Sequence, residues 1–226
     1  MSSDDGSGKG YATRVRRFAA IALAGVALVV AGCGGASPKT SASPPAVAAT
    51  KPACPVAWRP GWQRLADQIG AAVYCPSWMP RPLDAKMGGS FFNGRFVDPD
   101  RSFLVSFVWM EADASGVQEV HVNFRGYPGS TAIPVCEDTL TVNGKTVHPK
   151  IPCFSDARGH KRFGPVTVTV YTANQGVDQW HVLYAWRRDG SLYTISQHVT
   201  PPYTYVQVVG NLDRMMRGLV RLPPSS

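Results

Sequence analysis

An apolar run follows a small basic cluster near the start of the chain and decides which residues are available for folding. The cluster lies within residues 14–17, and the uncharged run extends from Phe18 to about Val30. A secretory signal peptide has this order, with roughly 7–15 apolar residues before a cleavage point at small residues. A membrane-spanning helix needs about 20 apolar residues, more than this run offers. The pattern predicts an export signal over residues 1–32, so the fold is built from the residues beyond it.

The end of this run carries a second signal. The tetrapeptide Val30-Ala31-Gly32-Cys33 resembles the lipobox of bacterial lipoproteins, in which an aliphatic residue, a small residue and Gly or Ala precede Cys. The resemblance implies that Cys33 receives a diacylglycerol and becomes the first residue of the mature chain. Two acyl chains hold a protein stably on a bilayer, since each buried methylene contributes about 0.8 kcal/mol. We therefore expect a lipid anchor at the extracytoplasmic face of the cell membrane.

The composition of residues 34–52 marks a boundary. This stretch is rich in Ser, Pro and Ala and contains no aromatic residue. Because such a segment cannot bury enough apolar surface to offset its ordering entropy, it is predicted to be a disordered tether. We therefore divide the chain into the signal, the lipidated cysteine with its tether over 33–53, and a single domain over 54–226. Roughly 170 residues suffice for a substantial core.

Four cysteines remain once Cys33 is assigned to lipid. An even number of cysteines in an exported chain indicates disulfides. Three pairings are possible, and the spacing favours Cys54–Cys75 and Cys136–Cys153, which close short loops. A cysteine metal site usually contains close Cys-x-x-Cys pairs, and the sequence has none, so we expect no metal.

The hydrophobic periodicity predicts an α+β fold. Apolar residues at helical spacing predict a helix over 62–73, and a second amphipathic helix is predicted over 203–221. Between them, apolar and polar residues alternate from about residue 90, and Asn143-Gly144 and Asp189-Gly190 are strong hairpin signals. Hairpins favour an antiparallel sheet, here a meander of six to eight strands with both helices packed on it. This order loosely resembles the PsbP/Mog1-like exported domains, a likeness that implies no functional residue.

Catalytic motifs are absent from the sequence. It contains no nucleophile elbow, zinc-protease helix, phosphate loop or dinucleotide fingerprint, so we expect no cofactor. The net charge of +8 is not concentrated in a dense basic tract with interleaved aromatic residues, which argues against nucleic acid as a partner. The acidic pairs Asp98/Asp100 and Glu137/Asp138 are interpreted as turn and loop-edge carboxylates rather than as a catalytic pair.

Histidines and tryptophans are the remaining candidates for a site. His121, His181 and His198 fall in predicted strands and could converge if those strands are neighbours, although a solvated sheet face is the simpler interpretation. His148 and His160 are placed in loops. Most of the six tryptophans are expected in the core, and one or two exposed beside the Pro-rich loop at 76–82 would form a binding platform.

These observations favour a non-catalytic module of the cell envelope that binds a partner protein, a wall polymer or a small ligand. Two alternatives stay open. One is an enzyme, such as a hydrolase, that acts on envelope material through dispersed residues. The other is a structural accessory of an envelope complex. A deep pocket with converging carboxylates or histidines would favour the enzyme, and a shallow groove would favour the binding module.

Overall fold

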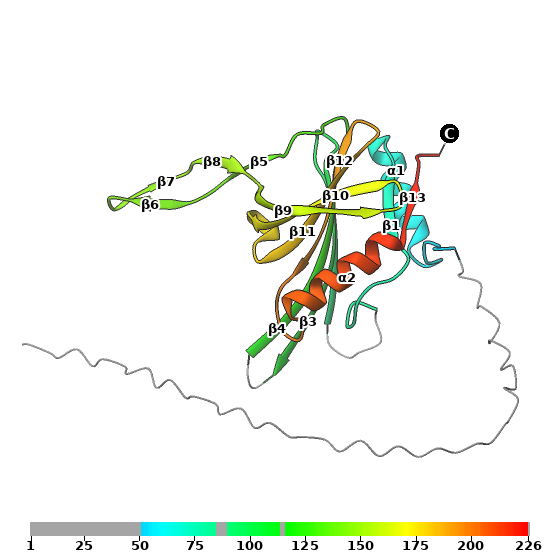
Figure 1. The fold of residues 1–226 in the computed structure, drawn as a ribbon, viewed down its shortest axis with the longest axis horizontal. Coiled ribbons are helices and arrows are strands. Elements are labelled where there is room, and N and C mark those ends of the chain that lie inside the picture. Colours follow the sequence, from blue (N-terminus) through cyan, green and yellow to red (C-terminus); the bar gives the residue numbers. More distant parts are fainter. Residues whose placement is uncertain (1–50, 85–89, 114–115, 226) are drawn as a thin grey trace, which may run out of the picture. The chain divides into compact units, whose positions relative to one another are not determined.

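The structure is a computed structural model that describes residues 51–84, 90–113 and 116–225. The signal sequence, Cys33 and nearly all of the tether lie outside the described residues, so they stay predictions. The described part is an α+β fold with one large antiparallel sheet (Figure 1). One helix precedes this sheet in the sequence and another follows it, as the periodicity predicts.

The main sheet contains seven antiparallel strands in the order β2-β3-β4-β12-β11-β10-β9. It is not one continuous meander, as expected from the sequence, but two. The first meander, β2 to β4, meets the last strand of the second, β12, so that the two central strands come from distant parts of the chain. The bounds are β2 Ser90–Val97, β3 Phe103–Asp113, β4 Gly116–Tyr127, β9 Phe154–Phe163, β10 Val166–Asn174, β11 His181–Arg188 and β12 Ser191–His198. A short 3-10 helix, η1 (Gly176–Asp178), connects β10 to β11.

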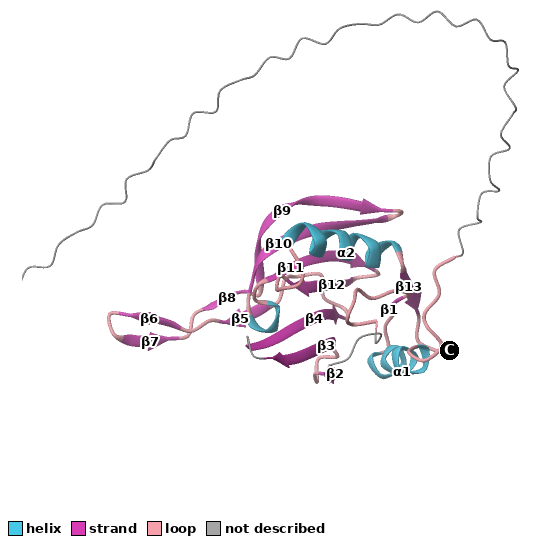
Figure 2. Cartoon of the chain, turned by 90° about the horizontal axis from the view of Figure 1, so that it is seen from below, coloured by secondary structure: helices cyan, strands magenta, loops and turns pink. Residues whose placement is uncertain are grey.

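Both predicted helices exist but are shorter than expected. Helix α1 spans Arg59–Ile69 and ends where Gly70 adopts a left-handed conformation, rather than continuing to Val73. Helix α2 spans Tyr205–Arg217 and begins with a capping box, in which Thr204 and Gln207 each satisfy the other's backbone N–H. Figure 2 shows α2 lying along one face of the main sheet.

Two short strands occupy residues that were predicted to be helix or loop. Residues 73–76 follow α1 and residues 219–222 follow α2. Strand β1 (Val73–Pro76) pairs with β13 (Leu219–Leu222), antiparallel, with Val73 opposite Leu222. Apolar residues such as Val73 and Leu219 fit a helical stripe equally well, so only the pairing between the two segments decides their structure.

A narrow arm leaves the body between β4 and β9 (Figures 1 and 2). At its base, β5 (Val135–Glu137) pairs with β8 (Lys150–Pro152), and β6 (Leu140–Val142) and β7 (Lys145–Val147) form its tip. Asn143 and Gly144 both have positive φ, as the predicted hairpin turn requires.

Both favoured disulfides are present. Cys54–Cys75 ties the segment before α1 to β1, and both of its cysteines are buried in the main core. Cys136–Cys153 closes the base of the arm. The two disulfides indicate an oxidising, extracytoplasmic location.

Alternation along the strands gives the main sheet two different faces. The face under the helices is apolar and packs against α1 and α2 through buried residues, among them Phe107, Val122, Phe124, Tyr184, Trp186 and Ile195. The opposite face carries a second, smaller apolar cluster that includes Leu183 and Leu192, and beside it polar side chains of β4 and β12 form part of the candidate site.

Candidate functional site

A row of small side chains hollows the face of the sheet opposite the helices. The register places Gly94 of β2 opposite Ser106 of β3, and Ser106 opposite Asn123 of β4. Gly94 has no side chain and Ser106 has a short one, so the row is lower than its neighbours. The resulting open groove has a volume of about 610 Å³, within the range typical of ligand sites.

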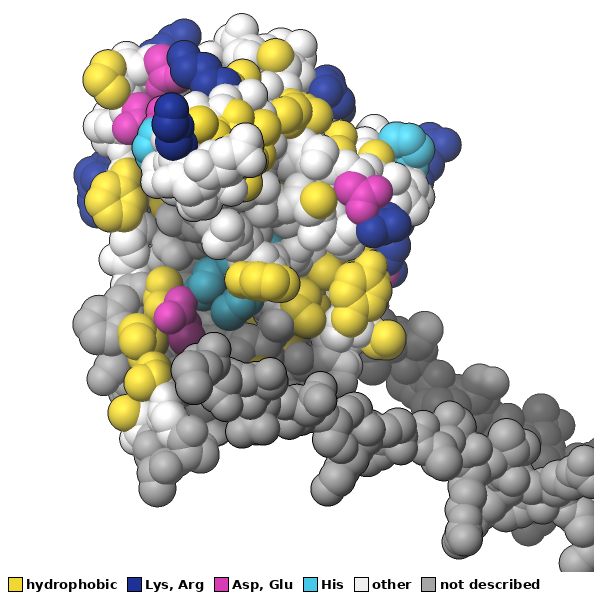
Figure 3. All heavy atoms as spheres, turned by 90° about the vertical axis from the view of Figure 1, so that its left-hand side faces the viewer, with side chains coloured by type: hydrophobic (Ala, Val, Ile, Leu, Met, Phe, Trp, Pro, Cys, Tyr) yellow, Lys and Arg dark blue, Asp and Glu magenta, His cyan; other side chains and the backbone are white. Residues whose placement is uncertain are grey.

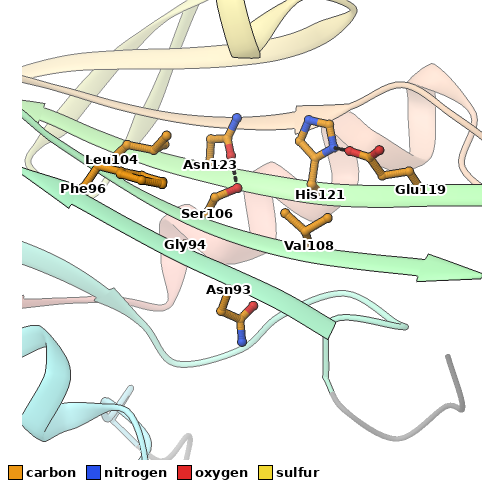
Figure 4. A pocket seen from close by; sticks show the side chains of 9 residues that line it. All are labelled: Asn93, Gly94, Phe96, Leu104, Ser106, Val108, Glu119, His121 and Asn123. Atoms are coloured by element: carbon orange, nitrogen blue, oxygen red, sulfur yellow. Dashed lines mark hydrogen bonds and ion pairs between the residues drawn. The ribbon is translucent and has the colours of Figure 1, made fainter. Parts of the chain in front are cut away.

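Bulkier residues border this row on both sides. On one side, Phe96 pairs with Leu104 across β2 and β3, and the Phe96 side chain is 63% exposed. On the other side, Val108 of β3 pairs with His121 of β4. Figure 4 shows these side chains rising from the sheet around the groove. The lining of the groove is therefore mostly apolar, with polar groups from His121 and Glu119 added at one end.

One hydrogen bond and one close polar contact connect the polar groups of the groove. The Ser106 hydroxyl donates to the Asn123 amide oxygen at 2.6 Å. At the polar end, Nδ1 of His121 lies 2.7 Å from a Glu119 carboxylate oxygen. Dashed lines in Figure 4 mark both interactions. This close contact lacks the geometry of a hydrogen bond, so it does not fix which ring nitrogen of His121 carries the proton.

Asp178, in η1, fixes the floor behind the groove. Its carboxylate is buried and accepts hydrogen bonds from the Asn123 amide at 3.0 Å, the Arg125 guanidinium at 2.8 Å and the Ser196 hydroxyl at 2.7 Å. These donors come from β4 and β12, the two central strands. With three partners, one of them cationic, this buried carboxylate is well compensated, and it orients the Asn123 amide toward Ser106.

The three strand histidines converge beside the groove. His121 lies on β4, His198 on β12 and His181 on β11, and the last two are directly opposite each other. Their ring centroids are 4.4 to 5.2 Å apart. The sequence left this convergence open against a solvated sheet face, and the structure shows convergence with substantial burial. In Figure 3 the histidine side chains sit in a hollow flanked by hydrophobic and acidic side chains.

Burial keeps this cluster neutral at neutral pH. Burial lowers the pKa of all three imidazoles below the ordinary value, and mutual repulsion of their charged forms adds to this for His121 and His181. The pKa of His181 falls to about 4. The Glu119 carboxylate acts in the opposite direction on His121 and His198 without overcoming burial.

The tautomer of His181 follows from its partner. Its Nδ1 lies 2.7 Å from the Gln179 carbonyl oxygen, which can only accept, so Nδ1 carries the proton. The buried Nε2 atom has no hydrogen-bond partner in the described part of the chain.

The imidazole cluster does not have the geometry of a metal centre. The planes of the three rings are inclined by 24° to 50° and the rings lie over one another, so their nitrogens do not converge on one point. Among the described residues, no set of three or more His, Cys, Asp or Glu side chains is placed to hold a metal ion. Nor does Ser106 have the setting of a nucleophile, because the Asn123 amide oxygen cannot take its proton.

The other residues singled out from the sequence have varied positions. Trp180 is 78% exposed and directly precedes the histidine strand β11, whereas Trp78, in the Pro-rich loop, is half-buried and covered by the Arg214 guanidinium at 3.9 Å. The expected platform beside that loop is therefore not formed by an open Trp78.

His160 lies in β9 and not in a loop, so the prediction of a loop is wrong. The sequence suggested a loop because β9 is exposed and charged and lacks an alternating pattern. His148 follows β7 on the arm.

The acidic pairs behave as expected for turn residues. Asp98 and Asp100 both bind Ser102 in the turn between β2 and β3. Asp138 accepts the backbone N–H of Thr139 at the base of the arm tip. The carboxylates that matter at the groove, Glu119 and Asp178, were not identified from the sequence. Glu119 lies two residues before His121, so both side chains fall on one face of β4, and that spacing was a usable signal.

Comparison with known proteins adds no family to this description. No protein family model, curated protein or solved structure matches the chain. The resemblance to PsbP/Mog1-like domains thus stays a prediction. Neither described helix combines the length and apolar character needed to span a membrane.

Proposed function

We propose that the chain is a lipoprotein anchored through Cys33 to the extracytoplasmic face of the cell membrane, and that its folded part is a binding module. The export signal and lipobox support the anchor, and the two disulfides agree with an oxidising compartment. The groove over Gly94, Ser106 and Asn123 is the observation that carries the binding role.

The groove suits an uncharged ligand that combines an apolar face with a few hydroxyl or amide groups. The Glu119 carboxylate offers an oxygen acceptor, and the neutral His121 adds a further polar contact. The exposed Phe96 ring offers an apolar surface at the opposite end. A saccharide unit of a wall polymer combines these properties, since its ring has an apolar face and a rim of hydroxyl groups. An open groove also suits part of a long polymer better than a deep cavity does.

The binding proposal predicts that the purified protein binds a neutral oligosaccharide at Glu119. The probes are chitotetraose, which carries acetamido groups, and maltotetraose, which does not. We expect NMR signals of His121 and Asn123 to shift on titration, and Glu119→Gln to weaken binding about tenfold because a charge-assisted hydrogen bond is lost.

The matched control is Glu111→Gln, which changes an exposed glutamate on β3 that does not line the groove. It should bind as tightly as the unchanged protein. Absence of shifts at the groove with both oligosaccharides would rule out the saccharide proposal.

A hydrolase is the second candidate, and the Glu119–His121 contact is the observation that favours it. A carboxylate that orients a neutral imidazole is a common arrangement for a general base. Release of shorter sugars from either oligosaccharide, lost in His121→Gln, would support catalysis. Unchanged oligosaccharides after prolonged incubation with tight binding would leave the binding role.

The anchor predicts a change of cell fraction when Cys33 is replaced. Cys33→Ala removes the only atom to which the lipid would be attached, so the protein should move from the membrane fraction to the soluble extracytoplasmic fraction. The control is Ser37→Ala, which changes a residue of the predicted tether, leaves the lipobox and both disulfides intact, and should stay in the membrane fraction. A Cys33→Ala protein that stays wholly with membranes and is processed at the same site would contradict lipid attachment.

A further inference from the structure

A second cavity, of about 510 Å³, opens on the helix-covered side of the molecule. It lies where the β9–β10 turn, the end of α2 and the β1–β13 pair come together, as Figures 1 and 2 show. We call it the arginine pocket; its lining includes Tyr74, Arg162, Phe163, Trp186, Met216 and Arg217.

The two arginines of this pocket have no carboxylate partner in the described part of the chain. Arg162 donates to the Gly164 carbonyl oxygen at 3.1 Å, and the Arg217 guanidinium lies 5.6 Å from the centre of the Phe163 ring. Neighbouring cations are different, since Lys161 is paired with Asp213 at 2.8 Å. The pocket therefore carries two uncompensated positive charges with free N–H donors.

The wall of the pocket is aromatic and apolar. The Tyr74 and Trp186 rings meet edge to face at 5.3 Å, and Met216 lies beside them. Trp186 is 2% exposed, and its buried indole N–H makes no hydrogen bond of good geometry with the described residues. The indole N–H of Trp186 also lies near the Tyr74 hydroxyl. Burial raises the pKa of Tyr74, and the nearby Trp186 N–H reduces this rise without cancelling it.

We propose that the arginine pocket binds an amphiphilic anion, with a phosphate or carboxylate group held by Arg162 and Arg217 and an apolar body against Tyr74, Trp186 and Met216. Planar guanidinium groups match these anions with two parallel hydrogen bonds each. The pocket has the size of a small-molecule site. It is separate from the groove, because Trp186 and the groove residues project from opposite faces of the sheet.

Binding of phenyl phosphate to the full chain tests this site. Isothermal titration calorimetry gives the affinity, and the indole N–H signal of Trp186 in NMR spectra gives the location. The Arg162→Gln/Arg217→Gln double variant should bind at least about tenfold more weakly, and higher salt should weaken binding by the unchanged protein. Arg64→Gln, an exposed arginine on α1, is the matched control and should bind normally.

Two further probes identify the source of the anion. Inorganic phosphate should bind more weakly than phenyl phosphate, since it lacks the apolar body. Soluble dihexanoyl phosphatidylglycerol that binds more tightly than phenyl phosphate, and loses this affinity in the double variant, would assign a lipid phosphate; the reverse order would assign a free small anion. Equal affinity of the double variant and the unchanged protein, no phenyl phosphate binding at all, or equal affinity for phenyl and inorganic phosphate would overturn the proposal.

Discussion

At the residue scale, the three stacked imidazoles make the protein sensitive to acid. His181 is buried, and its pKa of about 4 in the folded protein lies below the ordinary value of 6.5. The pKa values of His121 and His198 are also lowered. An unfolded chain therefore takes up protons at pH values where the folded protein leaves these rings neutral.

The histidine cluster predicts that stability falls between pH 6.5 and about pH 4. Above pH 6.5 the rings are neutral in both states, and the full stability is present. As the pH falls, the unfolded state gains protons first, and His181 alone lowers the free energy of unfolding by about 1.4 kcal/mol per pH unit, while His121 and His198 act in the same direction. His181→Gln should reduce this slope by one proton, and His148→Gln, on the exposed arm, is the control. Urea unfolding across this pH range measures the slope, and an unchanged slope in His181→Gln would contradict the assignment.

Two glycines give opposite predictions for the same substitution. Gly126 lies on β4 opposite Phe103, and a Cβ atom there would be 2.3 Å from the Phe103 ring. Gly126→Ala should therefore destabilise the protein by about 1–3 kcal/mol through overpacking. Gly210, in α2, has open space around its Cα, so Gly210→Ala should stabilise by about 0.5–1 kcal/mol. Urea unfolding of both variants checks the signs, and stabilisation by Gly126→Ala would contradict the close approach.

At the scale of elements, the arm and the body differ in how much they bury. All the residues of β6 and β7, at the tip of the arm, are exposed. In the body, Cys54 and Cys75 form a buried disulfide, with exposed fractions of 6% and 0%. The arm therefore depends on its own disulfide and on the few hydrogen bonds at its base. The body is held by the main core.

This difference predicts unequal effects of removing the two disulfides. The Cys54→Ala/Cys75→Ala variant should lose about 3 kcal/mol of unfolding free energy, and more if the cavity that remains does not close. The Cys136→Ala/Cys153→Ala variant should lose less, while amides of residues 135–152 exchange faster with solvent. Urea unfolding and hydrogen exchange measure the two effects. Equal losses with unchanged exchange in the arm would refute the prediction.

The elements also differ in how well the sequence predicts them. Strands β3, β4, β11 and β12 lie over a core on one face or both, and their alternation or apolar density is easily recognised. Strand β9 is charged and mostly exposed, so it resembles a loop. Strands β1 and β13 contain four residues each and continue the apolar stripes of the neighbouring helices. Their structure depends on a partner far away in the chain.

At the scale of the whole molecule, the candidate site depends on how the two meanders join. The sequence indicates three strand histidines, and convergence was one of the two outcomes left open. The pairing of β4 with β12 produces this convergence, because the register that places Ser196 opposite Asn123 also brings His198 beside His121. Asp178 reaches both strands from η1, 55 residues beyond Asn123. No local pattern encodes such contacts, so the groove and its carboxylate could not be derived from periodicity alone.

The pairing of β1 with β13 has a consequence for how the chain reaches its native state. Since β13 pairs with β1, this contact can form only after residues 219–222 have been synthesised. Ser225 strengthens the closure by donating its backbone N–H to Asp67 of α1 at 2.6 Å. Strand β1 therefore lacks its partner strand until late in synthesis, when residues 219–222 become available.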